Sequence, residues 1–345
     1  MKIAAILPSR NEAATIAAVT AAVDTALSGA QAVIISADAS DTPATTERFT
    51  ATRTRAAKLP LAGLPRGKGT QILAAARHLA AAADLVLIAD TDTRNPDPAV
   101  YAALLEQVRD GAGLAIADYP RHWDEANLTN HVARPLIAAA AGTDVPQPLA
   151  GDLALPASAL ARGVRAYRDL PGPLAACAGG YGIDAFLLLA AARGPVAAVP
   201  VAQAKLHAGS FPHLPAIFRQ AVPVLLHLTA GGPPRGAPAT AVYRVGGRTV
   251  EPQRMEAMLG TLNALAGEAG GYDEHPWPLP VADAWHSVRS GVPAPEAATI
   301  LWPHYIRRVR AWLTSGQHAT ATQLADILAG AHVRLSAALT SQGNP

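Results

Sequence analysis

Short apolar runs and longer segments of helical composition alternate over the first two thirds of the chain. The apolar runs predict strands at residues 2–7, 32–36, 84–89 and 114–117. The segments between them predict helices at 12–27, 42–52, 69–82 and 98–109, and Asn11 is the candidate cap of the first. Repeated strand–helix units indicate an α/β fold built on a doubly wound, mostly parallel sheet.

The remainder of the chain is predicted to be mainly helical. Helices are expected at 130–141 and 182–192, then an extended segment at 196–206, then an apolar helix at 213–229 that Pro215 and Pro223 break. A stretch rich in proline and glycine, 231–238, marks a boundary, and helices are expected beyond it at 251–266, 295–315 and 320–340. We therefore expect a main domain at 1–230 and a helical C-terminal appendage at 240–345.

Composition and charge narrow the class of protein. Half of the 345 residues are hydrophobic, which is enough for a substantial core, and the formal net charge is only +2. No strong basic stripe is visible, which argues against nucleic acid as a partner. Cys177 is the single cysteine, so a disulfide within the chain is excluded and a reducing compartment is favoured. No run of about twenty apolar residues lacks a charge or a proline, and the first residues do not resemble a signal peptide. We expect a cytoplasmic protein without a membrane span.

Polar clusters follow three of the predicted strands, at 9–12, 37–41 and 90–92. In doubly wound sheets, ligands bind outside the carboxyl ends of the strands. Because three strand ends carry such clusters, the sequence predicts a binding site at that edge of the sheet.

Asp90-Thr91-Asp92 is the central cluster, because it places two carboxylates just past a buried apolar strand. Carboxylate oxygens are preferred ligands of Mg²⁺ and Mn²⁺, which are often shared with substrate phosphates. A structural loop is the alternative, since a D-x-D pattern on its own is common. Its position after the strand favours a site that binds a metal and a diphosphate.

Gly67-Lys68-Gly69 opens the helix that precedes this strand. Glycines let the backbone approach an anion closely, and a lysine can pair with phosphate. The segment is not a P-loop, because Gly63 is one residue too close and Gly69 stands where Ser or Thr is required. We therefore reject an ATPase and keep a plain surface turn as the alternative to a phosphate contact.

The order of these motifs resembles the GT-A-fold glycosyltransferases of the family 2 type. Such enzymes open with P-x-x-N-E, as at 8–12 here, and continue with an acidic segment that 38–41 matches imperfectly, a G-K-G-like turn and the D-x-D. Further motifs follow in order at 131–136, 147–152, 180–184 and 205–207. They resemble V-A-R-P-L, Q-P-L-x-G-E, G-Y-G-x-E and a later His of glucosyl-3-phosphoglycerate synthases and related retaining enzymes. The resemblance covers roughly residues 1–230, and it implies a nucleotide-binding half at 1–120 and an acceptor half at 121–230.

The resemblance implies a role for each matching residue. The donor nucleotide would be bound by Pro8, Ser9, Arg10, Glu12, Asp38, Asp41, Gly67, Lys68, Asp90 and Thr91. The donor sugar and acceptor would face Gly151, Asp152, Tyr181 and Asp184. The metal, Mg²⁺ or Mn²⁺, would be held by Asp92 and His207, with Asp90 on the metal or the ribose. The implied reaction moves a glucose-like sugar from a nucleotide diphosphate, with UDP favoured, to a small soluble acceptor. A homodimer is a further possibility.

The catalytic groups follow from the type of transfer. The cation and Lys68 would stabilise the leaving diphosphate. With retention, a phosphate oxygen accepts the acceptor proton, whereas inversion would need a base, for which Asp152 and Asp184 are the candidates. Both replace a Glu of the family pattern.

Departures from the pattern concern the acceptor. Gly209 stands where the phosphoglycerate enzymes carry Asn, and the segment 153–156 is apolar where they are more polar. A 3-phosphoglycerate acceptor is therefore doubtful. Two rivals are kept, a sugar-1-phosphate nucleotidyltransferase and a non-catalytic nucleotide-sugar-binding paralogue. A Rossmann dehydrogenase is excluded because G-x-G-x-x-G is absent.

Overall fold

The computed structural model describes residues 1–79, 83–207, 209, 211–235, 241–267 and 276–341. Contacts divide the chain into two compact units. The sheet unit comprises Met1–Tyr119 and Gln147–Ser210, and the helical unit comprises Pro120–Pro146 and Phe211–Pro345. The functional division into a donor half and an acceptor half stays a prediction.

A seven-stranded sheet with the order β3-β2-β1-β4-β6-β5-β7 forms the centre of the sheet unit. Its strands are β1 (Lys2–Ser9), β2 (Gln31–Asp38), β3 (Ala57–Leu61), β4 (Leu85–Ile88), β5 (Leu114–Asp118), β6 (Leu153–Pro156) and β7 (Val196–Pro200). Neighbouring strands are parallel, except that β6 runs antiparallel to both β4 and β5. The predicted α/β fold with a mostly parallel sheet is confirmed.

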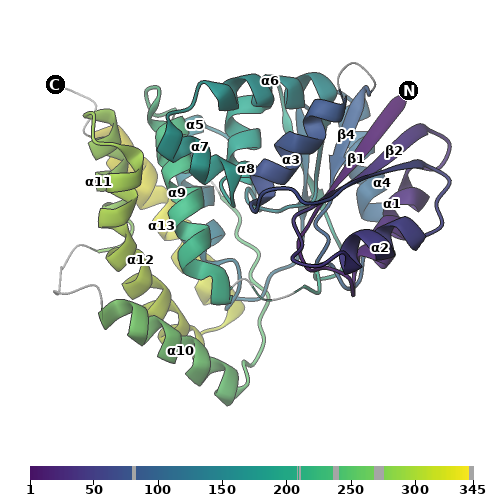
Figure 1. The fold of residues 1–345 in the computed structure, drawn as a ribbon. Coiled ribbons are helices and arrows are strands. Elements are labelled where there is room, and N and C mark those ends of the chain that lie inside the picture. Colours follow the sequence, from purple (N-terminus) through teal and green to yellow (C-terminus); the bar gives the residue numbers. More distant parts are fainter. Residues whose placement is uncertain (80–82, 208, 210, 236–240, 268–275, 342–345) are drawn as a thin grey trace. The chain divides into compact units, whose positions relative to one another are not determined.

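Helices cover both faces of this sheet. They are α1 (Ile16–Ala26), α2 (Ala44–Ala51), α3 (Lys68–Ala76), α4 (Pro98–Arg109), α6 (Ala157–Arg168), α7 (Gly172–Gly179) and α8 (Ile183–Phe186). Helix α3 packs on β1 and β2 and contacts α6 and α7, whereas α1 and α4 pack together on the opposite side of the strands (Figure 1). Helix α4 has the predicted bounds and begins with Pro98. Its N-cap is Asp97, whose side chain accepts from the Ala99 N–H.

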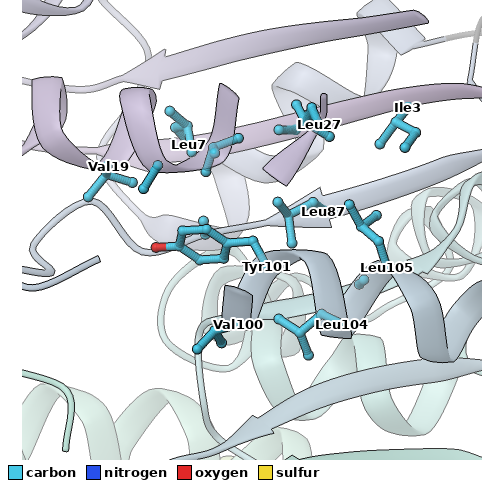
Figure 2. Close-up of a cluster of buried hydrophobic side chains, with 14 of the residues drawn as sticks. Ile3, Leu7, Val19, Leu27, Leu87, Val100, Tyr101, Leu104 and Leu105 are labelled. Atoms are coloured by element: carbon cyan, nitrogen blue, oxygen red, sulfur yellow. The ribbon is translucent and has the colours of Figure 1, made fainter. Parts of the chain in front are cut away.

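The core of the sheet unit lies on both faces of β1, which is buried from Ile3 onwards. A strand covered on both faces is expected to be apolar along its whole length, which explains the run of Ile, Ala and Leu. On one face, Leu7 lies among side chains of α1 and α4, where Figure 2 shows Val19, Leu87 and Tyr101 in the same cluster. This packing fixes where β1 and β4 end, and so where their polar clusters stand.

The helical unit contains no strand among its described residues. Its helices are α5 (Arg134–Ala141), α9 (Leu214–Ala230), α10 (Pro252–Gly267), α11 (Leu279–Arg289), α12 (Ala294–Gly316) and α13 (Ala321–Ser341). Within the described part of the chain, no single helix is long and apolar enough to cross a membrane. One pair of short helices, Gly172–Gly179 with Ile183–Ala191, has the required length and composition only when taken together, and it is bent by 107°.

Several sequence expectations need correction. Asn11 does not cap the first helix, which starts later with Thr15 as its N-cap; Asn11 instead has a φ of 60° in the loop after β1. Pro223 does not break α9, which continues through it. The predicted helix at 69–82 corresponds to α3 and a 3₁₀ turn at Arg77–Leu79, and residues 80–82 lie outside the described residues.

The sequence analysis missed two strands, β3 and β6, and several helices. Strand β3 contains Lys58 and Pro60, which are rare in strands but tolerated at an edge of a sheet. Strand β6 has four residues, and its antiparallel place between two other strands depends on the whole sheet. Helices α6, α7 and α11 were also missed. These elements complete the sheet unit and the helical unit around the predicted frame.

Candidate active site

Three polar clusters meet at the carboxyl edge of the sheet, because β1 is the parallel neighbour of both β2 and β4. Ser9 is the register partner of Asp38, so the loops after β1 and β2 leave the sheet side by side. Thr91 is buried in the loop after β4, and its hydroxyl donates to the Pro8 carbonyl at 2.7 Å. The structure therefore brings together the clusters that the sequence placed at separate strand ends.

Asn11 joins the first two of these loops. Its side-chain amide donates to Asp41 Oδ2 at 2.9 Å, and its carbonyl oxygen accepts from the Asp41 N–H at 3.0 Å. Asp41 is an exposed carboxylate that also pairs with Arg66 and, at 3.8 Å, with Arg10. Hydrogen bonds from Asn11 and Arg66 lower the pKa of Asp41. This corner is exposed and carries charges of both signs.

Asp38 differs from Asp41 because it is buried and already has internal partners. Its carboxylate accepts from the Ser40 N–H at 3.0 Å, from the Ser40 hydroxyl, and from the Thr46 hydroxyl at 2.7 Å. These donors come from the turn after β2 and from α2. Asp38 thus fixes the shape of the loop, and Asp41 is the carboxylate of this segment that faces solvent.

The start of α3 approaches a second glycine-rich segment. A Cβ on Gly69 would overlap the backbone of Ala178 and Gly179, and one on Gly67 would overlap the Gly179 carbonyl. Gly67 also has a φ of +129°, which side chains rarely adopt. The glycines therefore let the helix start touch the chain just before Gly180, and Lys68 projects from that start.

Lys68 lies between two carboxylates. Its ammonium is 2.9 Å from Asp90 Oδ1 and 3.0 Å from Asp184 Oδ1. Burial by itself lowers the pKa of Lys68, but Asp184 and Asp90 together raise it above the ordinary value, so the group stays protonated. Burial raises the pKa of Asp184 to about 6, although Lys68 opposes this shift.

A second lysine, Lys205, holds the other oxygen of Asp90. Its ammonium is 2.8 Å from Asp90 Oδ2 and 2.8 Å from Asp152 Oδ2, with its side chain only 4% exposed. Asp152 is fully buried, and it also accepts from the Tyr119 hydroxyl and the Asp90 N–H. Although burial alone would raise the pKa of Asp90, Lys205 and Lys68 hold it well below its usual range.

A glycine at position 151 allows the chain before β6 to approach Asp90 closely. A Cβ on Gly151 would overlap the Asp90 carboxylate. The glycine is therefore needed for the approach of β6 to the Asp90 loop, beside any contact it makes with a ligand. Tyr181, by contrast, is 38% exposed.

Asp92 and His207 face each other next to this cluster. His207 Nδ1 lies 3.8 Å from Asp92 Oδ2, and both side chains are partly exposed, 22% and 32% respectively. Burial and the neighbouring Asp90 raise the pKa of Asp92. Glu12 is half-buried nearby, where burial chiefly raises its pKa and the charges of Asp92 and Asp90 add to the shift.

The pair formed by Asp92 and His207 fits a divalent cation. Within the described residues, no group of three or more His, Cys, Asp and Glu side chains could hold a metal ion by itself. One carboxylate and one imidazole suit Mn²⁺ or Mg²⁺ when water and substrate phosphates supply the remaining ligands. Asp90 is less suited to this purpose, because each of its oxygens already faces an ammonium group.

Not every motif residue lies in this cluster. His131 and Arg134 belong to the helical unit and are buried there. Arg134 pairs with Asp144 through two hydrogen bonds of 2.6 and 2.7 Å and stacks on Tyr243. This segment therefore stabilises the core of the helical unit.

Lys205 and Tyr119 are the site residues to which the sequence analysis assigned no role. The signal for Lys205 was its place two residues before His207, but a lysine next to carboxylates distant in sequence cannot be recognised from spacing. The segment 153–156 also needs a new interpretation. It forms β6, buried in the sheet between β4 and β5, so its apolar character serves the core and says nothing about the acceptor.

Comparison with known proteins supports the fold and the class of enzyme. A scan of family models finds no match, and neither does a search of curated proteins. Among solved structures, glucosyl-3-phosphoglycerate synthase from Mycobacterium tuberculosis in complex with Mn²⁺, UDP-glucose and phosphoglyceric acid is 25% identical, with a TM-score of 0.51 over 70% of this chain and 82% of that one. The same enzyme with Mn²⁺, UDP and phosphoglyceric acid is also 25% identical, with a TM-score of 0.51 over 68% and 80% of the two chains. The likeness confirms the predicted GT-A fold and the prediction of a glycosyltransferase.

Proposed function

We propose that this chain transfers a glucose-like sugar from a UDP-linked donor to a small acceptor, with retention at the anomeric carbon and with Mg²⁺ or Mn²⁺ as cofactor. The observation that carries the proposal is the pair of Asp92 and His207, placed at the carboxyl edge of the sheet beside the fixed ammonium group of Lys68. The similar enzyme has been solved with Mn²⁺ and UDP-glucose together, which supports the same donor and cofactor here.

The metal would be held by Asp92 and His207. When bound, the cation supplies positive charge to the diphosphate as that group leaves. Asp90 supports the site in a different way, because Lys68 and Lys205 fix its carboxylate. We assign Asp90 to orienting these lysines and to a contact with the donor ribose, rather than to the metal.

Lys68 is the protein group that we assign to the leaving diphosphate. Asp90 and Asp184 aim its ammonium, which is held protonated, and the lysine side chain as a whole is 17% exposed. A preorganised positive charge of this kind stabilises developing negative charge without needing to move. Pro8, Ser9, Arg10, Glu12 and Asp41 line the edge where the nucleotide would lie, and Thr91 and Asp38 hold their loops in place.

The chemical step can be written without a protein base. The bond from the anomeric carbon to the diphosphate breaks, and its electron pair stays on the diphosphate. The acceptor hydroxyl forms the new bond on the same face, and its proton passes to the departing phosphate oxygen. The complete burial of Asp152 supports this scheme, because a general base must reach the proton that it removes. In this scheme the carboxylate of Asp184 contacts the donor sugar. Gly151 and Tyr181 are assigned to the same part of the site.

The test is a binding experiment with folded protein. Thermal unfolding is followed with UDP, GDP, ADP and dTDP, each with and without Mn²⁺, for the wild type and for Asp92→Asn. A ligand at one hundred times its Kd stabilises the native state by about 2.7 kcal/mol. We expect a shift with UDP that requires Mn²⁺ and is lost in Asp92→Asn. Asp110→Asn is the control, since Asp110 is an exposed carboxylate at the end of α4.

Two results would contradict the proposal. If no nucleoside diphosphate stabilises the folded wild-type protein, the chain does not bind a donor of this class. If pyrophosphate is released from a nucleoside triphosphate and a sugar 1-phosphate, the chain is a nucleotidyltransferase. Retention itself is tested by the anomeric proton coupling in the NMR spectrum of the sugar released from UDP-glucose.

A further inference from the structure

His207 stands on a segment that has no regular structure of its own. The chain leaves β7 at Pro200, and residues 204–207 belong to no helix or strand. A metal ligand must be held within narrow limits of position and orientation, which an irregular segment does not ensure by itself. Contacts from elsewhere in the sheet unit therefore have to hold it.

Besides the ion pairs that the Lys205 side chain makes with Asp90 and Asp152, the contacts to the backbone of this segment come from the loop that carries Asp92. The Arg94 N–H donates to the Leu206 carbonyl at 2.7 Å. The Asn95 side chain adds two more bonds, because its amide N–H donates to the Ala204 carbonyl at 3.0 Å and its carbonyl oxygen accepts from the Leu206 N–H at 2.7 Å. The amide of Asn95 thus pairs with the backbone on both sides of Lys205.

The three bonds join the two segments that supply the proposed ligands. Asn95 is three residues after Asp92, and Leu206 is one residue before His207. An asparagine side chain carries an N–H donor group and a carbonyl acceptor in a single plane, so it can imitate a backbone partner. Alanine at this position would keep the Arg94 bond and lose both of the others.

We propose that Asn95 is a positioning residue for the metal site, which holds the segment 204–206 so that His207 faces Asp92. This inference rests on the proposed function, in which Asp92 and His207 bind the cation. Asn95 touches neither the metal nor the substrate in this scheme, and it acts only through His207.

The rival explanation is that Asn95 only stabilises the fold. If Asn95 only stabilised the fold, its loss would lower the stability of the protein and alter many parts of the site. Loss of a positioning residue would weaken metal binding through His207 alone. A double-mutant cycle separates the two, because mutations that act through one group are not additive.

The experiment measures Mn²⁺ affinity from the electron paramagnetic resonance signal of free Mn²⁺, at one fixed concentration of UDP. The proteins are the wild type, Asn95→Ala, His207→Ala and the double variant. Removing a partner that orients a metal ligand typically weakens metal affinity about 10–100-fold. We expect such a loss for Asn95→Ala and no further loss when Asn95→Ala is added to His207→Ala.

Asp97→Ala is the matched control, because Asp97 lies two residues further along the same loop. It removes the N-cap bond of α4, from the Ala99 N–H to Asp97, and leaves the contacts with residues 204–206 intact. We expect a lower thermal stability with Mn²⁺ affinity within twofold of the wild type. Hydrogen exchange of the Leu206 amide should become faster in Asn95→Ala and stay unchanged in Asp97→Ala.

The outcomes are distinct. Mn²⁺ affinity of Asn95→Ala within twofold of the wild type would refute the inference, and so would losses that simply multiply in the double variant. If wild-type protein with UDP binds no Mn²⁺ beyond what UDP binds alone, the proposed function fails and the inference fails with it.

Discussion

Replacing Lys205 with methionine removes an ammonium group from between two carboxylates, Asp90 and Asp152. Both contacts measure 2.8 Å, the lysine side chain is 4% exposed, and that of Asp152 is fully buried. Asp90 keeps Lys68, whereas Asp152 is left with the Tyr119 hydroxyl and the Asp90 N–H. The substitution changes the charge while nearly preserving the length of the side chain.

The magnitude follows from the cost of a buried charge without a partner. Removing one member of a buried ion pair typically destabilises a protein by about 3–5 kcal/mol. A shift of one pKa unit corresponds to about 1.4 kcal/mol. In the folded variant, one of the two carboxyl groups that have lost Lys205 is expected to take up a proton, because protonation removes the cost of a buried charge without a partner.

The sign of the pH dependence follows from this proton. A folded state that binds more protons than the unfolded state loses stability as the pH rises, by at most about 1.4 kcal/mol per pH unit for one proton. The stability deficit of Lys205→Met relative to the wild type should thus be largest at pH 8 and smaller at pH 5.

The assay has to report on the sheet unit. All of the chain's tryptophans lie in the helical unit, at positions 123, 277, 285, 302 and 312. Tryptophan fluorescence would therefore report on the unfolding of the helical unit. Hydrogen exchange of β1 and β4 peptides in urea follows the sheet unit, and far-UV circular dichroism reports on the whole chain in parallel.

Lys58→Met is the matched control. The Lys58 ammonium donates to the carbonyls of Phe49, Thr50 and Thr52. Its loss leaves no carboxylate without a partner, so we expect a smaller loss of about 1–3 kcal/mol that does not vary between pH 5 and pH 8. A deficit for Lys205→Met below about 1 kcal/mol, or one that grows as the pH falls, would refute the reasoning.

Three further predictions use the same unfolding measurement. Gly67→Ala should destabilise by at least about 2 kcal/mol, because its φ is +129° and its Cβ would overlap the Gly179 carbonyl; Gly63→Ala, at a φ of +69° with no atom within 4 Å of the new Cβ, should lose less. Asp38→Ala should lose about 3 kcal/mol or more, since it leaves several partly buried donors without the acceptor that they share; a loss below about 1 kcal/mol would contradict this. Burial raises the pKa of Asp184 to about 6, so the wild type should lose stability as the pH rises from about 4 to 6, and Asp184→Asn should lack this part of the slope; equal slopes would show that the shift is absent.

Much of the frame was predictable because it depends on local pattern. Helix α4 was predicted with its exact bounds from Pro98 to Arg109, since proline at its start and periodic apolar residues are local signals. Strands β1 and β4 were recognised because a central parallel strand is apolar throughout. Strand β6 was missed, because its antiparallel place between β4 and β5 depends on the whole sheet.

The sequence by itself determined the α/β order, the polar strand ends and the residue types of the site. Those features depend on neighbours along the chain, and the motif order alone led to the GT-A fold. Only the tertiary structure decided which groups meet. In the structure, Lys205 forms an ion pair with Asp90, which lies 115 positions away in the sequence. Asn11 forms hydrogen bonds with Asp41 and does not cap a helix. A buried charge needs a partner of opposite charge, and that partner is determined by distance in space and not by distance along the chain. The pairing of lysines with carboxylates could therefore be assigned only from the folded sheet.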